Sequence, residues 1–187
     1  MQESVLETYH SSFNSAGGDL ALGIPLLPLN AARTTTDVTS TEGQDIVDEA
    51  IRLFRANVLF KNYKIEGPAD RLIVFLTVFI QKCLQEMQRF PQKERAEQVV
   101  QLIVNDGVDP MSNTFFMRRL GLLPDGKSPA ETAKCRDMLK KCMDLCAKRL
   151  LSMLYASEAG EMDRKFWLAF GKKTFLGQKF VDKMYSL

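Results

Sequence analysis

The sequence has little of what enzymes use for catalysis. His10 is its single histidine among 187 residues, so a Ser-His-Asp or Cys-His arrangement would have to use a residue from an N-terminal segment rich in Ser, Thr and Gly. The scattered glycines match neither G-x-x-x-x-G-K-S/T nor G-x-G-x-x-G, the patterns that bind phosphates and dinucleotides. Asp48 and Glu49 are adjacent carboxylates, but the electrostatics of a helix start explain them. We therefore predict no enzyme and no cofactor.

Cysteine is sparse, and no C-x-x-C pair is present. Three of the four cysteines fall on one side of a single predicted helix, at positions 135, 142 and 146. Two thiolates from Cys142 and Cys146 would suit a metal ion, as in a small metal-dependent helical enzyme. The alternative is that these are free, buried thiols, because free cysteine is among the most buried residue types and the neighbouring Met138 is typical of a core. We favour reduced, buried thiols and predict no metal site.

Long hydrophobic runs are absent as well. The longest apolar stretch, Leu72–Ile80, has nine residues with only Thr77 polar, far fewer than the ~20 needed to span a bilayer. Residues 1–7 do not show the basic region and apolar core of a secretory signal. We therefore expect the protein in the cytosol, where the thiols stay reduced.

The chain has little excess charge of either sign. Its net charge is +2, which is too small to indicate nucleic-acid binding. Its distribution is uneven. Residues 1–50 hold Arg33 as their one basic residue against eight acidic residues, a net charge of −7, so residues 51–187 carry +9. A basic body attracts an acidic protein surface or anionic lipid. The charge pattern therefore indicates a binding partner of negative charge, and it does not help to choose between folds.

What the sequence does contain is helical periodicity. Val47, Ile51, Phe54 and Val58 recur at helical spacing. The run Leu72–Ile80 fits either a buried strand or a buried helix, but Cys83, Leu84 and Met87 continue it at helical spacing and no second strand-like run is there to pair with it. The predicted helices cover about 44–62, 68–90, 92–105, 129–157 and 163–175, with a short helix at 114–120 and one or two further turns in 178–187.

The N-terminal part lacks this periodicity. Leu20–Leu29 is too apolar to be left in solvent, and its two prolines forbid a regular helix, so we predict an extended arm laid over the body. The sequence thus predicts an all-α, irregular single-domain fold of about five helices with an extended N-terminal arm. Residues 1–43 form the arm and connector, and residues 44–187 form the helical body.

Two helix starts carry capping signals. Thr41 followed by Gln44 has the spacing of a capping box before the helix at 44–62. Ser128 followed by Glu131 has the same spacing, with Pro129 at the first helical position. Both pairs predict where their helices begin.

Basic residues lie outside the apolar stripe of the helix at 44–62, and basic and aromatic residues alternate in the segment Lys165–Phe175. Trp, Phe, Lys and Arg in this combination are typical of protein interfaces. A second interpretation is that Phe166, Trp167 and Phe170 close the core while Lys172 and Lys173 stand in water. An amphipathic membrane-binding helix is a third interpretation, which Glu161 and Asp163 disfavour.

A family resemblance adds to this picture. The stretch Asp45–Arg71, DIVDEAIRLFRANVLFKNYKIEGPADR, resembles subunit 3 of the actin-related protein 2/3 complex. Tyr9-His-Ser-Ser and the apolar Ile24–Leu29 are similar to the family's N-terminal motifs. Asp163–Leu176 resembles its late aromatic-basic motif, which commonly has paired tryptophans where this chain has Phe166-Trp167. The resemblance covers about residues 9–87 and about the last thirty residues, whereas 105–145 departs from the family pattern.

The resemblance implies a non-enzymatic, structural subunit of a seven-protein complex that nucleates branched actin filaments. The expected partners are actin-related protein 3, the other subunits, the side of the mother filament and nucleation-promoting factors, in the cytoplasmic actin cytoskeleton. The residues assigned to partner contact are Arg52, Arg55, Lys61, Lys64, Lys165, Trp167, Lys172 and Lys173. The alternative is a free-standing helical adaptor or peripheral membrane module that uses the same basic surface.

Overall fold

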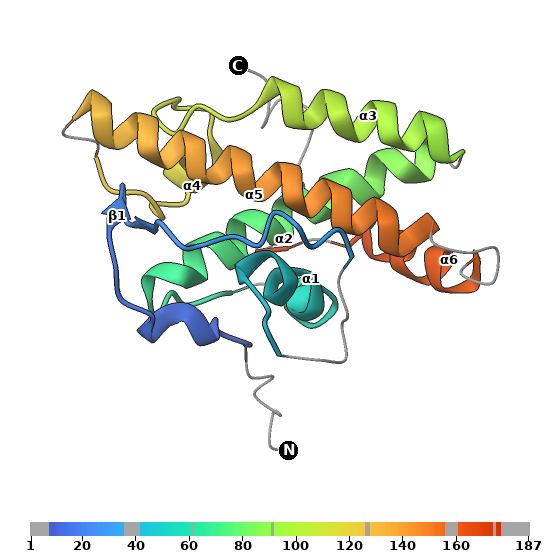
Figure 1. The fold of residues 1–187 in the computed structure, drawn as a ribbon, viewed down its shortest axis with the longest axis horizontal. Coiled ribbons are helices and arrows are strands. Elements are labelled where there is room, and N and C mark those ends of the chain that lie inside the picture. The colour runs from blue at the N-terminus through green and yellow to red at the C-terminus, as the bar shows by residue number, and fades with distance from the viewer. Residues whose placement is uncertain are drawn as a thin grey trace.

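The computed structural model describes residues 8–35, 42–60, 62–90, 92–125, 128–155, 161–173 and 175–176, leaving aside the side chains of 161–163. The elements in chain order are η1 (Ser12–Ser15), β1 (Leu20–Ala21), β2 (Ile24–Pro25), α1 (Ile46–Asn57), α2 (Pro68–Arg89), α3 (Lys93–Asp106), α4 (Phe116–Arg119), α5 (Pro129–Tyr155) and α6 (Glu161–Phe170). The helices pack as an irregular bundle, with the N-terminal segment running along its outside (Figure 1). The predicted all-helical fold with an extended arm is confirmed.

The helix α2 is the centre of this bundle and contacts α1, α3, α5 and α6. Residues from Leu72 to Leu84 are all buried, which is the pattern of a helix surrounded by other elements. The hydroxyl of Thr77 donates to the carbonyl of Ile73 at 2.7 Å, so the one polar residue of the apolar run is satisfied within the helix. The structure confirms a helix here over a strand. No described helix has a stretch long and apolar enough to cross a bilayer.

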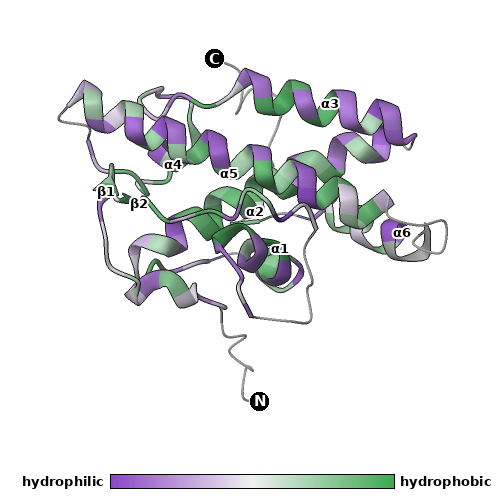
Figure 2. Cartoon of the chain, viewed as in Figure 1, coloured by the Kyte–Doolittle hydropathy of each residue, from purple (hydrophilic) through white to green (hydrophobic). Residues whose placement is uncertain are grey.

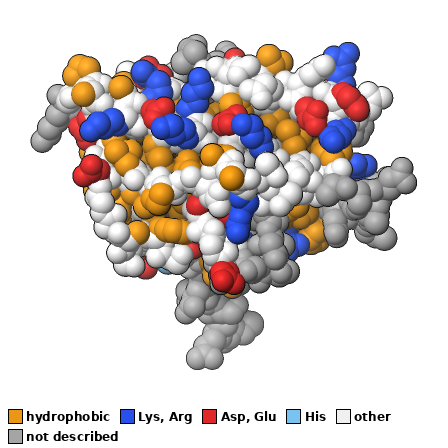
Figure 3. All heavy atoms as spheres, in the orientation of Figure 1, with side chains coloured by type: hydrophobic (Ala, Val, Ile, Leu, Met, Phe, Trp, Pro, Cys, Tyr) orange, Lys and Arg blue, Asp and Glu red, His pale blue; other side chains and the backbone are white. Residues whose placement is uncertain are grey.

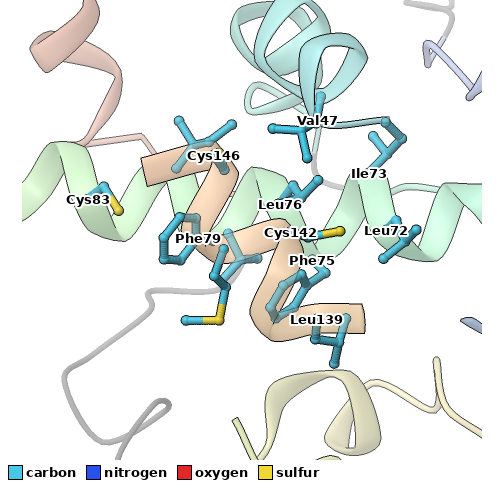
Figure 4. Packing of buried hydrophobic residues seen from close by; sticks show 14 of the residues in the cluster. Val47, Leu72, Ile73, Phe75, Leu76, Phe79, Cys83, Leu139, Cys142 and Cys146 are labelled. Carbon is cyan, nitrogen blue, oxygen red and sulfur yellow. The ribbon is translucent and has the colours of Figure 1, made fainter. Parts of the chain in front are cut away.

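The long helix α5 packs across α2 and supplies the other half of the core. Most of the side chains predicted to face inward are buried: Met138, Leu139, Cys142, Leu145, Cys146, Leu150 and Leu154, while Met153 is half-buried. In Figure 2 the helices around α2 carry apolar residues on the side that faces α2 and polar residues on the outer side. Figure 4 shows Phe75 and Phe79 of α2 beside Leu139 and Cys142 of α5. Between α2 and α5 the interior therefore combines aromatic, sulfur-containing and aliphatic side chains.

The N-terminal arm contains a small hairpin that the sequence analysis did not predict. β1 and β2 pair antiparallel, with Leu20 opposite Pro25. Their two-residue loop, Leu22 and Gly23, has φ values of +52° and +72°, the left-handed conformations of a tight hairpin turn. Leu22 adopts this unfavourable conformation while buried, and its N–H donates to Glu131 of α5 at 2.8 Å. Burial and this bond hold the turn against the body.

The helix α1 is shorter than predicted and ends at Asn57 instead of about residue 62. The side chain of Asn57 accepts from the N–H of Tyr9 at 3.2 Å and donates to its carbonyl at 3.0 Å. Just beyond, the carbonyl of Phe60 accepts from the N–H of Leu176 at 2.9 Å. These tertiary bonds end the helix, and helical spacing in the sequence does not reveal them.

The capping predictions were partly wrong. The N-cap of α1 is Asp45, which forms a capping box with Asp48; of the predicted pair, Gln44 precedes the cap and Thr41 lies outside the described residues. At α5, Ser128 accepts from the N–H of Ala130 at 3.2 Å, as predicted. The Glu131 carboxylate, however, accepts from Leu22 in the arm. At α1 a second local pair, Asp45 and Asp48, forms the cap, whereas at α5 a tertiary contact uses the side chain that local spacing assigned to the cap.

Candidate interaction surface

The basic residues predicted on α1 lie at its outer side. Arg55 is exposed, Arg52 is half-buried with Nη2 at 3.7 Å from Glu49 Oε1, and Lys64 is exposed in the loop before α2. Lys61 lies outside the described residues. Because Val47, Ile51 and Phe54 occupy the opposite side of α1 and are fully buried, the helix presents its cations to solvent.

The helix α6 packs along the edge of α1 where this outer side meets the buried side, and it contacts both Phe54 and Arg55. The indole of Trp167 stacks on Phe54 with ring centroids 5.8 Å apart. The guanidinium carbon of Arg55 lies 5.4 Å from the ring centroids of both Phe166 and Trp167, within the range of cation–π attraction. Two segments more than a hundred residues apart in sequence therefore form one surface, which we call the α1–α6 surface: Arg52, Arg55, Lys64, Lys165, Phe166, Lys172 and Lys173.

The aromatic pair of α6 divides between core and surface. Trp167 is 7% exposed and Phe166 is 51% exposed. The interpretation that this segment closes the core therefore holds for Trp167, whereas the ring of Phe166 stays open to solvent. Trp167 supports the surface from below, and Phe166 is the aromatic ring that faces solvent.

Three glutamines of α2 fix the end of α6. The amide of Gln88 donates to the carbonyl of Leu168 at 2.8 Å, and that of Gln85 donates to Gly171 at 2.9 Å. The amide of Gln81 donates to the carbonyl of Lys173. Carbonyls at and just beyond a helix C-terminus lack intrahelical partners of the regular kind. The glutamines add a bond to Leu168, whose carbonyl also accepts from the Gly171 N–H at 3.0 Å, and supply acceptor partners for Gly171 and Lys173 beyond the helix. The turn carrying the exposed Lys172 and Lys173 is thereby attached to the central helix.

Gly171 is required for this attachment because the backbones approach closely. A Cβ at this position would lie 3.1 Å from the backbone nitrogen of Gln85 and 3.2 Å from the carbonyl carbon of Leu84. Further on, Phe175 packs against Tyr63 with ring centroids 6.4 Å apart, beside Lys64. Of the residues assigned to partner contact, Arg55 and Trp167 are in direct contact, and the other described ones lie on α1, on α6 or in the segments that follow these helices.

Beneath α1 lies a buried ion pair that sequence analysis missed. Arg149 of α5 is fully buried and donates two hydrogen bonds to Asp45, at 2.6 and 2.8 Å, with Nη1 also 3.2 Å from Asp48 Oδ1. Its remaining donors reach the carbonyls of Asn30 and Arg33 in the arm. Burial alone would raise the pKa of Asp45, but the bonds from Arg149 and from backbone N–H groups hold that pKa below its ordinary value.

A second polar network ties the N-terminus to α1 and α2. Glu49 accepts from the Ser11 hydroxyl at 2.5 Å and from the Ser12 hydroxyl at 2.7 Å. Asp70 accepts from the Ser11 N–H at 2.8 Å and from the Asn14 amide at 2.9 Å, and lies 2.8 Å from His10 Nδ1. Burial would raise the pKa of Asp70, yet these bonds lower it. The single histidine therefore lies within a structural clamp.

The cysteines lie apart from this surface, inside the core. Burial raises the pKa of the Cys142 and Cys146 thiols well above the ordinary value, which disfavours the thiolate that a metal would bind. No group of three or more His, Cys, Asp or Glu suited to a metal ion occurs in the described parts of the chain. The candidate site is thus a cationic and aromatic surface whose available chemistry is binding.

Comparison with known proteins gives this surface a context. Residues 6–180 match the family described as P21-Arc, the ARPC3 (21 kDa) subunit of the ARP2/3 complex. The match includes residues 105–145, where the sequence analysis found a departure from the family pattern.

Individual relatives agree over nearly their whole length. The chain is 36% identical to actin-related protein 2/3 complex subunit 3 of Arabidopsis thaliana, covering 90% of this chain and 96% of the relative. It is 33% identical to the protein of that name from Dictyostelium discoideum, over 91% and 98%. With the one from Schizosaccharomyces pombe it shares 34% identity, over 92% and 99%.

Proposed function

This chain belongs to the ARPC3 family, and on that premise we propose that it is a structural, non-enzymatic subunit of the actin-related protein 2/3 complex that supports the nucleation of branched actin filaments. The observation that carries the proposal is the family match over residues 6–180. The fold supports it, because the polar clusters around Asp45, Glu49 and Asp70 join segments of the chain and exposed cations remain on the outer side of α1 and beyond α6. The corresponding location is the cytoplasmic actin cytoskeleton.

The finer proposal is that the α1–α6 surface docks on the actin-related protein 3 subunit and contributes near the mother filament, with nucleation-promoting factors as possible further partners. Its support is electrostatic and steric. Arg55, Lys172 and Lys173 are exposed cations, and Phe166 offers an exposed ring beside them. Cations around an aromatic anchor suit an acidic protein surface.

Copurification tests the first proposal. The affinity-tagged full chain, recovered from cells at physiological salt and analysed by mass spectrometry, should bring down both actin-related proteins and the remaining subunits in near-equal amounts. Recovery of the chain as a monomer would contradict membership of the complex and favour the adaptor or peripheral membrane alternative.

Charge reversal tests the finer proposal. Replacing Lys172 and Lys173 together by Glu should lower incorporation into the complex, or branching by the assembled complex, by at least about tenfold, because like charges facing each other across an interface cost several kcal/mol and about 1.4 kcal/mol is already a factor of ten. Both side chains are exposed, so thermal stability should stay unchanged. The measurements are subunit stoichiometry and a branching assay by fluorescence microscopy.

A matched control reverses two other exposed cations, Arg119 of α4 and Lys140 of α5, to Glu. This variant should incorporate and branch like the natural protein. Equal behaviour of the two double variants would remove the α1–α6 surface from the interface.

A further inference from the structure

A groove runs between the N-terminal arm and α5, away from the α1–α6 surface. Its cavity volume is about 590 Å³. The arm wall is apolar throughout, formed by Leu26, Leu27, Leu29 and Ala31. The α5 wall mixes Met138 and Leu145 with lysines and aspartates. Figure 3 shows apolar side chains open to solvent on this face beside a row of charged ones, and Figure 1 places α6 near the opposite, C-terminal end of α5.

The α5 wall has the spacing of a helix-pairing seam. Lys134, Met138, Lys141, Leu145 and Lys148 line the groove at intervals of four, three, four and three residues, the repeat by which one helix packs along another. The same series continues to Ser152 and Tyr155. These two residues line a second groove, of about 990 Å³, between α5 and α3, and Lys148 lines both.

The length of the seam argues for an elongated occupant. From Lys134 to Tyr155 the helix rises roughly 30 Å at about 1.5 Å per residue. A compact small molecule would cover only part of this distance, whereas a helix of five or six turns would follow it. The apolar arm wall would then enclose the near side of that helix.

The charge of the seam specifies the occupant's chemistry. Lysine recurs at every seventh residue, at 134, 141 and 148, and an amine in a closed seam requires a carboxylate opposite it. Lys141 now pairs with Asp137 at 2.6 Å and Lys148 with Asp144 at 2.7 Å. The lysine side chains are 63% and 60% exposed, and exposed pairs of this kind contribute little to stability. The amines are therefore easily redirected to a partner.

We propose that this seam binds an amphipathic helix of another subunit of the complex, with apolar side chains facing the half-buried Leu26 and Leu29 of the arm beside the largely buried Met138 and Leu145. Carboxylates of that helix, at seven-residue intervals, would face the lysines. The proposal rests on the proposed function, since it takes the partner from the complex. It adds a second interface, because the residues involved are separate from those of the α1–α6 surface. The chain then joins its neighbours through two different surfaces. The α1–α6 surface is cationic with one exposed aromatic ring, and the seam on α5 combines apolar residues with lysines.

Lysine reactivity tests the proposal on the purified complex and on the free full-length chain. Both are labelled briefly with an amine-acetylating reagent and quantified by mass spectrometry. Lys134, Lys141 and Lys148 should react at least about fivefold more slowly in the complex. Lys140, exposed on α5 and outside both grooves, should react equally in the two samples.

Zero-length cross-linking with a carbodiimide identifies the occupant. The seam lysines should link to Asp or Glu residues of one helix in another subunit, spaced about seven residues apart. Links from the seam lysines to a second copy of this chain, or links confined to their present partners Asp137 and Asp144 with none to another subunit, would overturn the proposal. So would equal reactivity of the seam lysines in the free chain and the complex.

Two neighbouring substitutions separate this interface from folding and from membership of the complex. Lys141→Glu should lower the affinity for the rest of the complex about tenfold, while Lys140→Glu leaves it unchanged. If the chain assembles but the seam lysines stay reactive and Lys141→Glu has no effect, the seam proposal fails and the proposed function stands. If the chain does not assemble at all, both fail.

Discussion

At the scale of single residues, Arg149 is a fully buried cation that joins α5 to the start of α1 and to the N-terminal arm. The residue lies on the same helix as Cys142 and Cys146 and next to Leu150, so its position on the apolar stripe was the one signal in the sequence. Spacing alone does not reveal its partners, because Asp45 and the arm carbonyls are about a hundred or more residues away. The predicted apolar core, by contrast, followed directly from the 3.6-residue period.

Arg149→Met should destabilise the protein by about 3–5 kcal/mol, because it leaves the carboxylates of Asp45 and Asp48 buried without their partner. Urea denaturation measures the loss. Arg136→Met is the matched control on the same helix, since Arg136 pairs with Asp109 at an exposed site and its removal should cost about 1 kcal/mol or less. Similar costs for the two variants would show that the buried pair contributes little.

At the scale of elements, the helices were predictable and their ends were not. The sequence predicted helices at 68–90 and 92–105, and the structure has them at Pro68–Arg89 and Lys93–Asp106. Gly67, Pro68 and Gly107 mark these ends locally. Where the end depends on a distant segment, as at Asn57 with Tyr9, local signals fail. The convergence of α1 and α6 is of this second kind, so the sequence identified the residues of the surface without showing that they meet.

The central position of α2 makes its aromatic residues critical. Phe75→Ala should cost about 3–5 kcal/mol, because Phe75 is fully buried and packs against Phe115 and Phe116 with ring centroids 6.2 and 6.4 Å apart. Phe90→Ala, at a residue 37% exposed just past the end of α2, is the control and should cost about 1 kcal/mol or less. Near-natural thermal stability of Phe75→Ala would refute the central role of this helix.

The attachment of α6 is testable at Gly171. Gly171→Ala should loosen α6 from α2 at a cost of about 1–3 kcal/mol, because the added methyl would lie 3.1 to 3.2 Å from backbone atoms of α2 and α6, which must shift to admit it. Hydrogen exchange should speed up in residues 161–173 while the core of α2 stays protected. The neighbouring Ala169→Ser, at an exposed position, should leave exchange unchanged. Unchanged exchange in Gly171→Ala would show that the close approach is not needed.

At the scale of the whole molecule, the acidic residues 1–50 and the basic residues 51–187 are joined by ion pairs within the chain, as between Asp45 and Arg149. Asp45, Asp48 and Glu49 are buried by contacts with Arg149, Ser11 and Ser12. The uneven charge of the sequence is thus partly neutralised internally, and the cations that remain exposed are concentrated on the outer faces. Composition predicted a basic body, but only the fold shows which cations are left for a partner.

This internal pairing gives stability a definite pH dependence. The pKa values of Asp45 and Asp70 are lowered from 3.8 by folding. A carboxylate with a lowered folded pKa contributes stability that is present above the unfolded pKa and lost as pH falls through the folded one. The free energy of unfolding, measured by urea titration, should therefore change little on this account down to about pH 5 and fall below about pH 4. Asp45→Asn should weaken that dependence, whereas Asp125→Asn, at a fully exposed carboxylate, should preserve it.

The way the arm is fastened sets an order for folding. The partners of the arm lie far along the chain. The N–H of Leu22 bonds to Glu131, 109 residues later, and the carbonyl of Asn30 bonds to Arg149, 119 residues later. Contacts of such long range form late, because they need the intervening chain to be organised first. During synthesis on the ribosome the segment made first is therefore among the last to be fixed. Until residue 149 has emerged, the apolar arm has no completed surface to cover, and a nascent chain of this protein passes through a stage in which its leader is open to chaperones.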